Sequence, residues 1–247
     1  MKKLLGLGPA VFFLLAQPAG QIWAATEIGP SKAAFRVELS PQVGSGRLSS
    51  GESVRHTTGY GVSISHDMTW SWLRDVGIKV SPKAELTNSV LSALRSRSDT
   101  KSVLTYDNRM ISGGVTVSPV TKLPIPGFEF PYASLAAGRG FSKVTIDESA
   151  SRTFRQSLYS GISGTFWSGE IGSWIPLKPD FGLSLALVGS SYIADQSQAS
   201  GTFQGEVLAP DDSLSLVSGS QDGSSAGLAK TLTIDTYSAK VGVFFQF

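Results

Sequence analysis

The chain ends in the stretch KTLTIDTYSAKVGVFFQF, Lys230 to Phe247, and this stretch decides the fold. From Tyr237 to Phe247 every second residue is apolar or aromatic, and the residues between them include Lys240 and Gln246. A period of two indicates an extended strand, because a helix repeats every 3.6 residues. Chain ends usually fray in water. A strand that alternates up to its last, aromatic residue is therefore expected to lie against apolar surroundings.

The last eight residues also carry a spaced motif of the form polar, x, Gly, x, x, hydrophobic, x, aromatic, which is filled by Lys240, Gly242, Phe245 and Phe247. This motif resembles the C-terminal assembly signal of bacterial outer-membrane β-barrel proteins. The resemblance implies an all-β fold, a transmembrane antiparallel up-and-down β-barrel. It also implies that the barrel assembly machinery inserts the chain, and that its partners include outer-membrane lipid and lipopolysaccharide. The alternative is the edge strand of a soluble sandwich.

The first 25 residues have the features of an export signal. A basic start with Lys2 and Lys3 precedes the apolar run Leu4–Ala16, and the small residues Ala24 and Ala25 offer a cleavage point. The apolar run is too short for a membrane-spanning helix. We therefore expect a cleaved signal peptide over 1–25 and export of the chain. A soluble periplasmic protein would carry the same signal, so it is the resemblance at the C-terminus that implies the bacterial outer membrane as the location.

Composition predicts a single domain over 26–247, because no Pro-rich linker or block of charge divides this part of the chain. Without Lys2 and Lys3, the 21 Lys and Arg residues fall to 19, which equals the 19 Asp and Glu residues. A neutral chain argues against nucleic acid as a partner, since that partner requires a basic face.

Alternation with a period of two recurs in seven segments before the terminal strand. Together they predict eight strands, over Phe35–Ser40, Thr58–Ser65, Val76–Leu86, Ile111–Ser118, Phe128–Phe141, Thr153–Ile175, Phe181–Leu187 and the C-terminal stretch. Two further segments, Gly201–Leu208 and Ser213–Ser218, would raise the number to ten if they joined the barrel. We expect them instead to form a hairpin outside the membrane.

The connections between these segments alternate in length. Short connections with Pro or aromatic residues follow the second, fourth and sixth strands, and long polar ones follow the others. Outer-membrane barrels alternate short periplasmic turns with long external loops. Long external loops are therefore expected near 44–57, 88–101 and 196–228. For 88–101, we favour two strands that continue past the membrane, and a short helix is the alternative.

Aromatic residues gather near the short turns and the C-terminus, where they are expected to form a girdle at the periplasmic interface. These residues are Trp70, Trp72, Phe128, Phe130, Tyr132, Trp174, Phe245 and Phe247.

Six charged residues on three of the expected strands lie on the rows opposite the apolar ones. They are Arg36, Glu38, Lys79, Lys83, Glu85 and Lys240. Lipid disfavours such charges at mid-depth, so we expect all six to point into the lumen. An eight-stranded barrel is only wide enough for side chains to fill it, and enclosed charges must be paired. We predict that Glu38 pairs with Lys240, and that Lys79, Lys83 and Glu85 belong to the same internal network. This network would either plug the barrel and fix strand register or line a narrow ion path.

Two classes of function remain open. The first is a non-enzymatic membrane protein with a structural or adhesion role, with recognition of a ligand by its loops, or with a narrow, porin-like path for small solutes. The second is an outer-membrane lipid or peptide hydrolase in which His56 acts with a loop serine and with Asp211 or Asp212. The serines near His56 are Ser49, Ser50 and Ser53. No metal or other cofactor is expected, because the chain has no Cys and its two His are separated by a whole strand.

Overall fold

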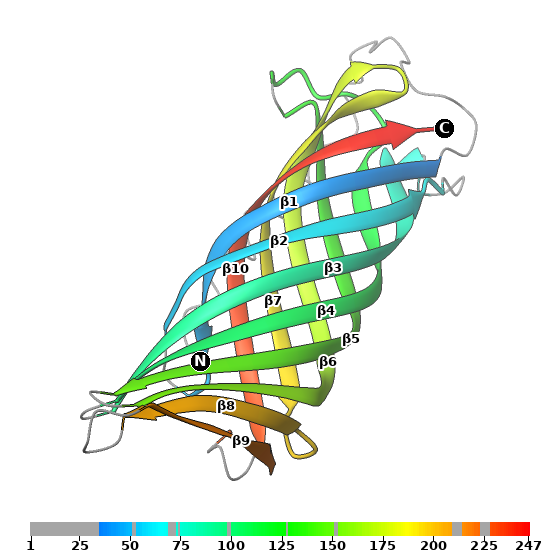
Figure 1. Ribbon diagram of the computed structural model, residues 1–247. Helices are drawn as coiled ribbons and strands as arrows, with labels where there is room; N and C mark the ends of the chain where they lie inside the picture. The colour runs from blue at the N-terminus through cyan, green and yellow to red at the C-terminus, as the bar shows by residue number, and fades with distance from the viewer. Residues whose placement is uncertain are drawn as a thin grey trace.

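The computed structural model describes residues 35–247 except 51–52, 69–72, 74, 98–99, 127, 151–152, 209–213 and 223–227. The described residues form ten strands (Figure 1). They are β1 (Phe35–Leu48), β2 (Ser53–His66), β3 (Ile78–Arg97), β4 (Thr100–Pro119), β5 (Phe130–Ala150), β6 (Thr153–Lys178), β7 (Phe181–Asp195), β8 (Ser200–Leu208), β9 (Leu214–Asp222) and β10 (Thr231–Gln246). The expected signal peptide lies outside the described residues.

Eight of these strands close into an antiparallel ring. Each strand from β1 to β6 pairs with the next along the chain, and β10 pairs with both β7 and β1. The ladder continues to the last residue, since Phe247 and Phe35 exchange two backbone hydrogen bonds. Closure pairs the backbone groups of the ring strands without leaving an edge, which is what a bilayer requires of a spanning sheet. The predicted up-and-down barrel of eight strands is confirmed.

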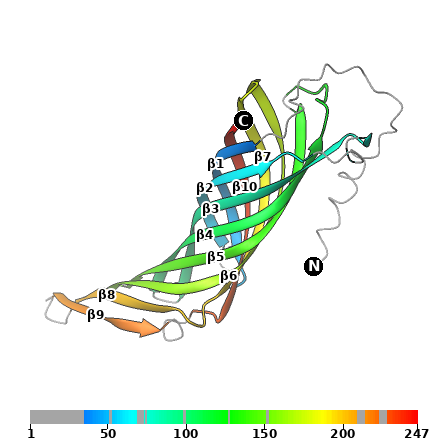
Figure 2. The ribbon, with the colours of Figure 1, turned by 90° about the vertical axis from the view of Figure 1, so that its right-hand side faces the viewer.

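The remaining two strands form a hairpin outside the ring. Strand β9 pairs with β8, and β8 pairs with the segment 153–160 at the start of β6. Figures 1 and 2 show this hairpin at one end of the barrel and the C-terminus at the other. We call the end where β1 begins and β10 ends the terminal rim, and the opposite end the hairpin end. The expectation that these segments form a hairpin rather than two barrel strands is confirmed.

The strands reach further toward the hairpin end than the expected loops allow. The loop expected over 44–57 was wrong in its bounds, because β1 runs to Leu48 and β2 begins at Ser53. Its Gly-rich sequence permits close strand pairing, since a Cβ on Gly44 would lie 2.2 Å from the carbonyl oxygen of Tyr237. Likewise 88–101 is mostly strand, as in the favoured alternative of continuing strands. The third expected loop, 196–228, contains β8 and β9.

The outer wall of the ring carries an apolar band. Every ring strand exposes large hydrophobic side chains on its outward row, for example Leu39, Ile64, Leu86, Ile111, Leu135, Ile171, Leu187 and Val241. Water-exposed patches of this extent are rare on soluble monomers, and an outward apolar band is the surface that a bilayer covers. The ring is therefore a transmembrane barrel.

Among the described residues, no helix is long and apolar enough to cross a membrane.

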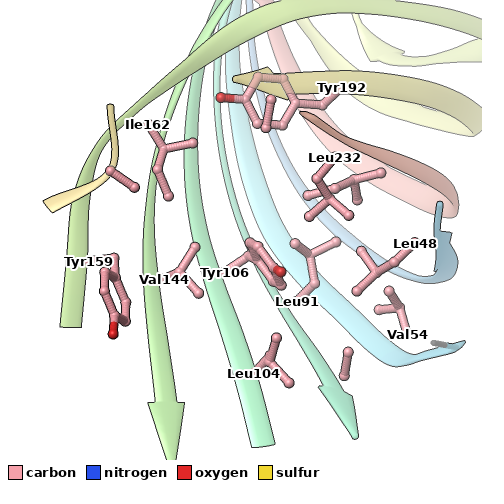
Figure 3. Packing of buried hydrophobic residues seen from close by; sticks show 14 of the residues in the cluster. Leu48, Val54, Leu91, Leu104, Tyr106, Val144, Tyr159, Ile162, Tyr192 and Leu232 are labelled. Carbon is pink, nitrogen blue, oxygen red and sulfur yellow. The ribbon is translucent and has the colours of Figure 1, made fainter. Parts of the chain in front are cut away.

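The interior has two layers of opposite character. Toward the terminal rim it holds buried charged residues, including Glu38, Glu170 and Lys240. Toward the hairpin end it holds an apolar layer (Figure 3). The apolar layer consists of Leu48, Val54, Leu91, Ala93, Leu104, Tyr106, Met110, Val144, Ile146, Tyr159, Ile162, Phe166, Tyr192, Ala194, Ala199, Leu232 and Ile234. Side chains therefore occupy both halves of the lumen.

Candidate functional site: a network of ion pairs in the lumen

A buried lysine lies at the centre of the charged layer. The ammonium group of Lys240, on β10, is 2.9 Å from Glu38 Oε1 on β1 and 2.9 Å from Glu170 Oε1 on β6. Lys240 is 1% exposed. Period-two alternation places all three side chains on the inner face of their strands. Each carboxylate thus gains a cation in a site that water does not reach.

The charged layer extends from Glu170 to β3. Lys83 Nζ lies 2.9 Å from Glu170 Oε2 and 2.9 Å from Glu85 Oε2. Two neutral groups complete it, because the Tyr132 hydroxyl donates to Glu170 Oε1 and the Ser184 hydroxyl donates to Glu38 Oε1. We call Glu38, Lys83, Glu85, Glu170 and Lys240 the ion-pair network. It contains three carboxylates and two ammonium groups, and it joins four strands of the ring.

A second group of charges lies nearer the terminal rim. Asp67, just beyond the end of β2, lies 2.6 Å from Lys79 Nζ and 3.7 Å from Arg36 Nη2. Burial raises the pKa of Asp67, but the charges of Arg36 and Lys79 outweigh this effect and hold the pKa below its ordinary value. The Arg36 guanidinium also lies 3.8 Å from the ring centre of Trp174, which stacks on Tyr132. We call Arg36, Asp67 and Lys79 the rim cluster.

The six charges predicted for the lumen fall into these two groups. The structure brings Glu38 to Lys240 and Lys83 to Glu85, and each residue of these pairs is at most intermediate in exposure. Lys79 was expected in the same network, but it pairs with Asp67 in the rim cluster. The reason is its position near the start of β3, beside the turn that carries Asp67.

Sequence reasoning missed Glu170, which holds both ammonium groups of the ion-pair network. The alternation of β6 is interrupted at Gly161, whose φ of 79° is a backbone conformation that other residues rarely adopt. Tyr159 and Ile162 both face inward as a result, so a single period of two does not describe the strand. The short inward series Phe166, Glu170, Trp174 was the available signal.

The aromatic girdle is confirmed only in part. Phe245 and Phe247 are 41% and 79% exposed on the outer wall, and Phe128 is exposed as well. Tyr132 and Trp174 were expected in the girdle and instead are buried in the lumen. They lie on inward rows, where the Trp174 ring faces Arg36 and Lys79 of the rim cluster and stacks on Tyr132. Trp70 and Trp72 lie outside the described residues.

The structure describes only some of the residues of the hydrolase alternative, and among these it shows no hydrogen bond between His56 and Ser49 or Ser50. His56 is exposed on β2. The hydroxyl of Ser49 accepts a hydrogen bond from the backbone N–H of Thr233. Asp211 and Asp212 lie outside the described residues. Among those that are described, no three or more His, Cys, Asp or Glu side chains gather as a metal site would require.

The sequence matches no protein-family model and no curated protein. Several solved structures are similar to the chain. A major outer-membrane protein from Thermus thermophilus shares 13% identity with a TM-score of 0.43, over 87% of this chain and 99% of that one. The outer-membrane protein AlkL shares 11% identity with a TM-score of 0.39, over 92% and 96% of the two chains. OprG from Pseudomonas aeruginosa shares 11% identity with a TM-score of 0.35, over 89% and 98%. Identities this low, with TM-scores below 0.5, transfer no function to this chain.

Proposed function

We propose that the protein is a non-enzymatic integral protein of the bacterial outer membrane, with a closed lumen and a recognition or adhesion surface at its hairpin end. The observation that carries the proposal is the filled interior. Buried ion pairs occupy the half near the terminal rim, and the apolar layer occupies the other half. A solute would have to displace side chains from both layers in succession.

If the lumen passes no solute, a ligand must bind to a surface, and the hairpin end offers one beyond the membrane. Strand β6 has 26 residues, whereas about 10 residues suffice to cross a bilayer. Its first residues pair with β8, so the hairpin extends the barrel wall as one continuous sheet. Leu216 on β9 is 85% exposed. A regular sheet beyond the membrane provides a firm surface for a ligand outside the cell.

The lumen is tested by conductance across a planar lipid bilayer. The purified barrel is expected to give no stepwise current in 1 M KCl, because charged and apolar side chains fill its lumen. The protein concentration is about that at which an open porin gives regular steps. An open porin in the same bilayer serves as the positive control. Regular current steps from the wild-type barrel would instead support a narrow solute path.

Location and orientation are tested with single cysteines, since the chain has none of its own. Ser218→Cys, on the exposed row of β9, is expected to react with a membrane-impermeant maleimide on intact cells. The matched variant Lys122→Cys, in the exposed turn between β4 and β5, is expected to react only after the outer membrane is permeabilised. The opposite pattern would place the hairpin in the periplasm and remove its role at the cell surface.

A further inference from the structure

Three cations project from the lipid-facing wall of the barrel. Arg109 on β4 and Arg139 and Lys143 on β5 are exposed, and they lie on the outward rows of their strands. Arg109 stands opposite Phe141, the outward residue between Arg139 and Lys143. Diagonal neighbours of this kind are about 7–8 Å apart between strands. The three side chains therefore share one small area, which we call the cationic patch.

The cationic patch has an excess of positive charge. None of its three residues forms an ion pair with another residue in the described part of the chain. The carboxylate on this stretch of the wall is Asp107, which stands opposite Lys143. Three cations beside one carboxylate leave the patch ready to hold an anion with more than one negative charge.

The height of the cationic patch is that of a membrane interface. Arg139 is nine residues beyond Phe130, the first residue of β5 at the terminal rim. Nine strand residues span about 30 Å, or about 23 Å along the barrel axis at a tilt of about 40°. The apolar band of such barrels is about 25 Å tall. The patch thus lies at the border of the apolar band nearer the hairpin end, where lipid headgroups begin.

A shallow, open apolar groove lies directly below the cationic patch. Its volume is about 330 Å³, and it is lined by Gly113, Leu135, Ala136, Ala137, Trp167 and Ser168. Gly113, Ala137 and Trp167 stand side by side across β4, β5 and β6, and the next outward row contains Arg139. Four of the six lining residues are Gly, Ala or Ser. The two large ones, Leu135 and Trp167, are 68% and 54% exposed.

We propose that this wall binds one phosphorylated lipid, with its phosphates on the cationic patch and an acyl chain in the groove. Arginine side chains suit phosphate because their planar forks donate two parallel hydrogen bonds. A groove on the lipid-facing wall meets acyl chains, and the charge above it selects among lipids by headgroup. With the proposed orientation, the lipid belongs to the outer leaflet, where lipopolysaccharide presents phosphates at this depth.

Native mass spectrometry of the purified full-length barrel in detergent tests the proposal. The probes are diphosphoryl lipid A, the same lipid with its phosphates removed, and sodium phosphate. The wild type is expected to retain one molecule of diphosphoryl lipid A. The double variant Arg109→Gln, Arg139→Gln is expected to bind this lipid with an affinity at least about tenfold lower. Ala137→Phe, which fills the groove, is expected to weaken binding as well. Lys101→Gln, an exposed lysine farther along β4, is the matched control and should bind like the wild type.

Any of the following three binding results would overturn the proposal, and so would a competition result. The three are equal binding by the arginine double variant and Lys101→Gln, equal binding of the dephosphorylated lipid, and unchanged binding by Ala137→Phe. Displacement of the lipid by millimolar sodium phosphate alone would also overturn it, because the acyl chain would then contribute nothing. Each variant is first shown to be folded by its heat-dependent shift in gel mobility. Since binding is measured in detergent, an error in the proposed cellular location would appear in the cysteine labelling and not here.

Discussion

Replacement of Lys240 by methionine is expected to lower the free energy of unfolding of the barrel by about 3–5 kcal/mol. The substitution keeps the length of the side chain and removes the ammonium group between Glu38 and Glu170. Two buried carboxylates then remain, and Glu38 loses the ammonium group with which it forms an ion pair. The loss of stability comes from leaving a buried charge without a partner. This loss is larger than the net stabilisation that the intact ion pair contributed. The measurement is the midpoint of unfolding in urea, with the heat-dependent gel shift as a second assay.

Two further variants separate this effect from a general loss of charge. Lys178→Met removes an exposed lysine at the terminal rim and should leave the midpoint unchanged. The double variant Lys240→Met, Glu38→Gln removes both charges of one pair and should regain part of the lost stability. If Lys240→Met unfolds at the same urea concentration as Lys178→Met, the ion-pair network does not stabilise the ring.

A valine at Gly138 is expected to destabilise the barrel by about 3 kcal/mol, at the upper end of the usual cost of overpacking. A Cβ at this position would lie 1.9 Å from the carbonyl oxygen of Ile111 and 2.6 Å from the Cα of Ser112. Both atoms belong to the backbone of β4, so they cannot rotate away as a side chain would. Strands β4 and β5 would have to separate along a ladder that contributes to ring closure.

The neighbouring strand offers the control for this prediction. Gly113 faces outward on β4, and the nearest atom to a Cβ there is 4.0 Å away. Gly113→Ala should therefore unfold within about 0.5 kcal/mol of the wild type, as substitutions at unconstrained surface sites usually do. Equal stability of Gly138→Val and Gly113→Ala in urea would contradict the close approach of β4 and β5.

The eight-stranded ring could be predicted from the sequence because most of its strands alternate with a period of two. Where a strand keeps a strict period of two, an apolar row must meet lipid and a charged row must meet the lumen, and β1, β3 and β10 follow this rule throughout their spanning segments. The eight strands and the inward direction of Glu38 and Lys240 follow from it.

Other features could not be predicted because they depend on contacts between strands. Glu170 was missed because the irregularity at Gly161 shifts the inward row of β6 by one residue. Trp174 lies on the same inward row as Glu170, and its contact with the Arg36 guanidinium joins β6 to β1, which are far apart in the sequence. The extension of β1 through Gly44 depends on how closely β10 approaches it.

The length of β6 has a mechanical consequence. The same strand carries the hairpin at one end and is hydrogen-bonded to β5 and β7 along its spanning part. A pull on the hairpin along the barrel axis would load these two ladders in shear, so many hydrogen bonds would bear the force together. A pull sideways would peel β8 from β6 one bond at a time. This geometry would suit a protein that holds a cell against flow, because the strand ladders resist a force along the barrel axis better than a sideways force.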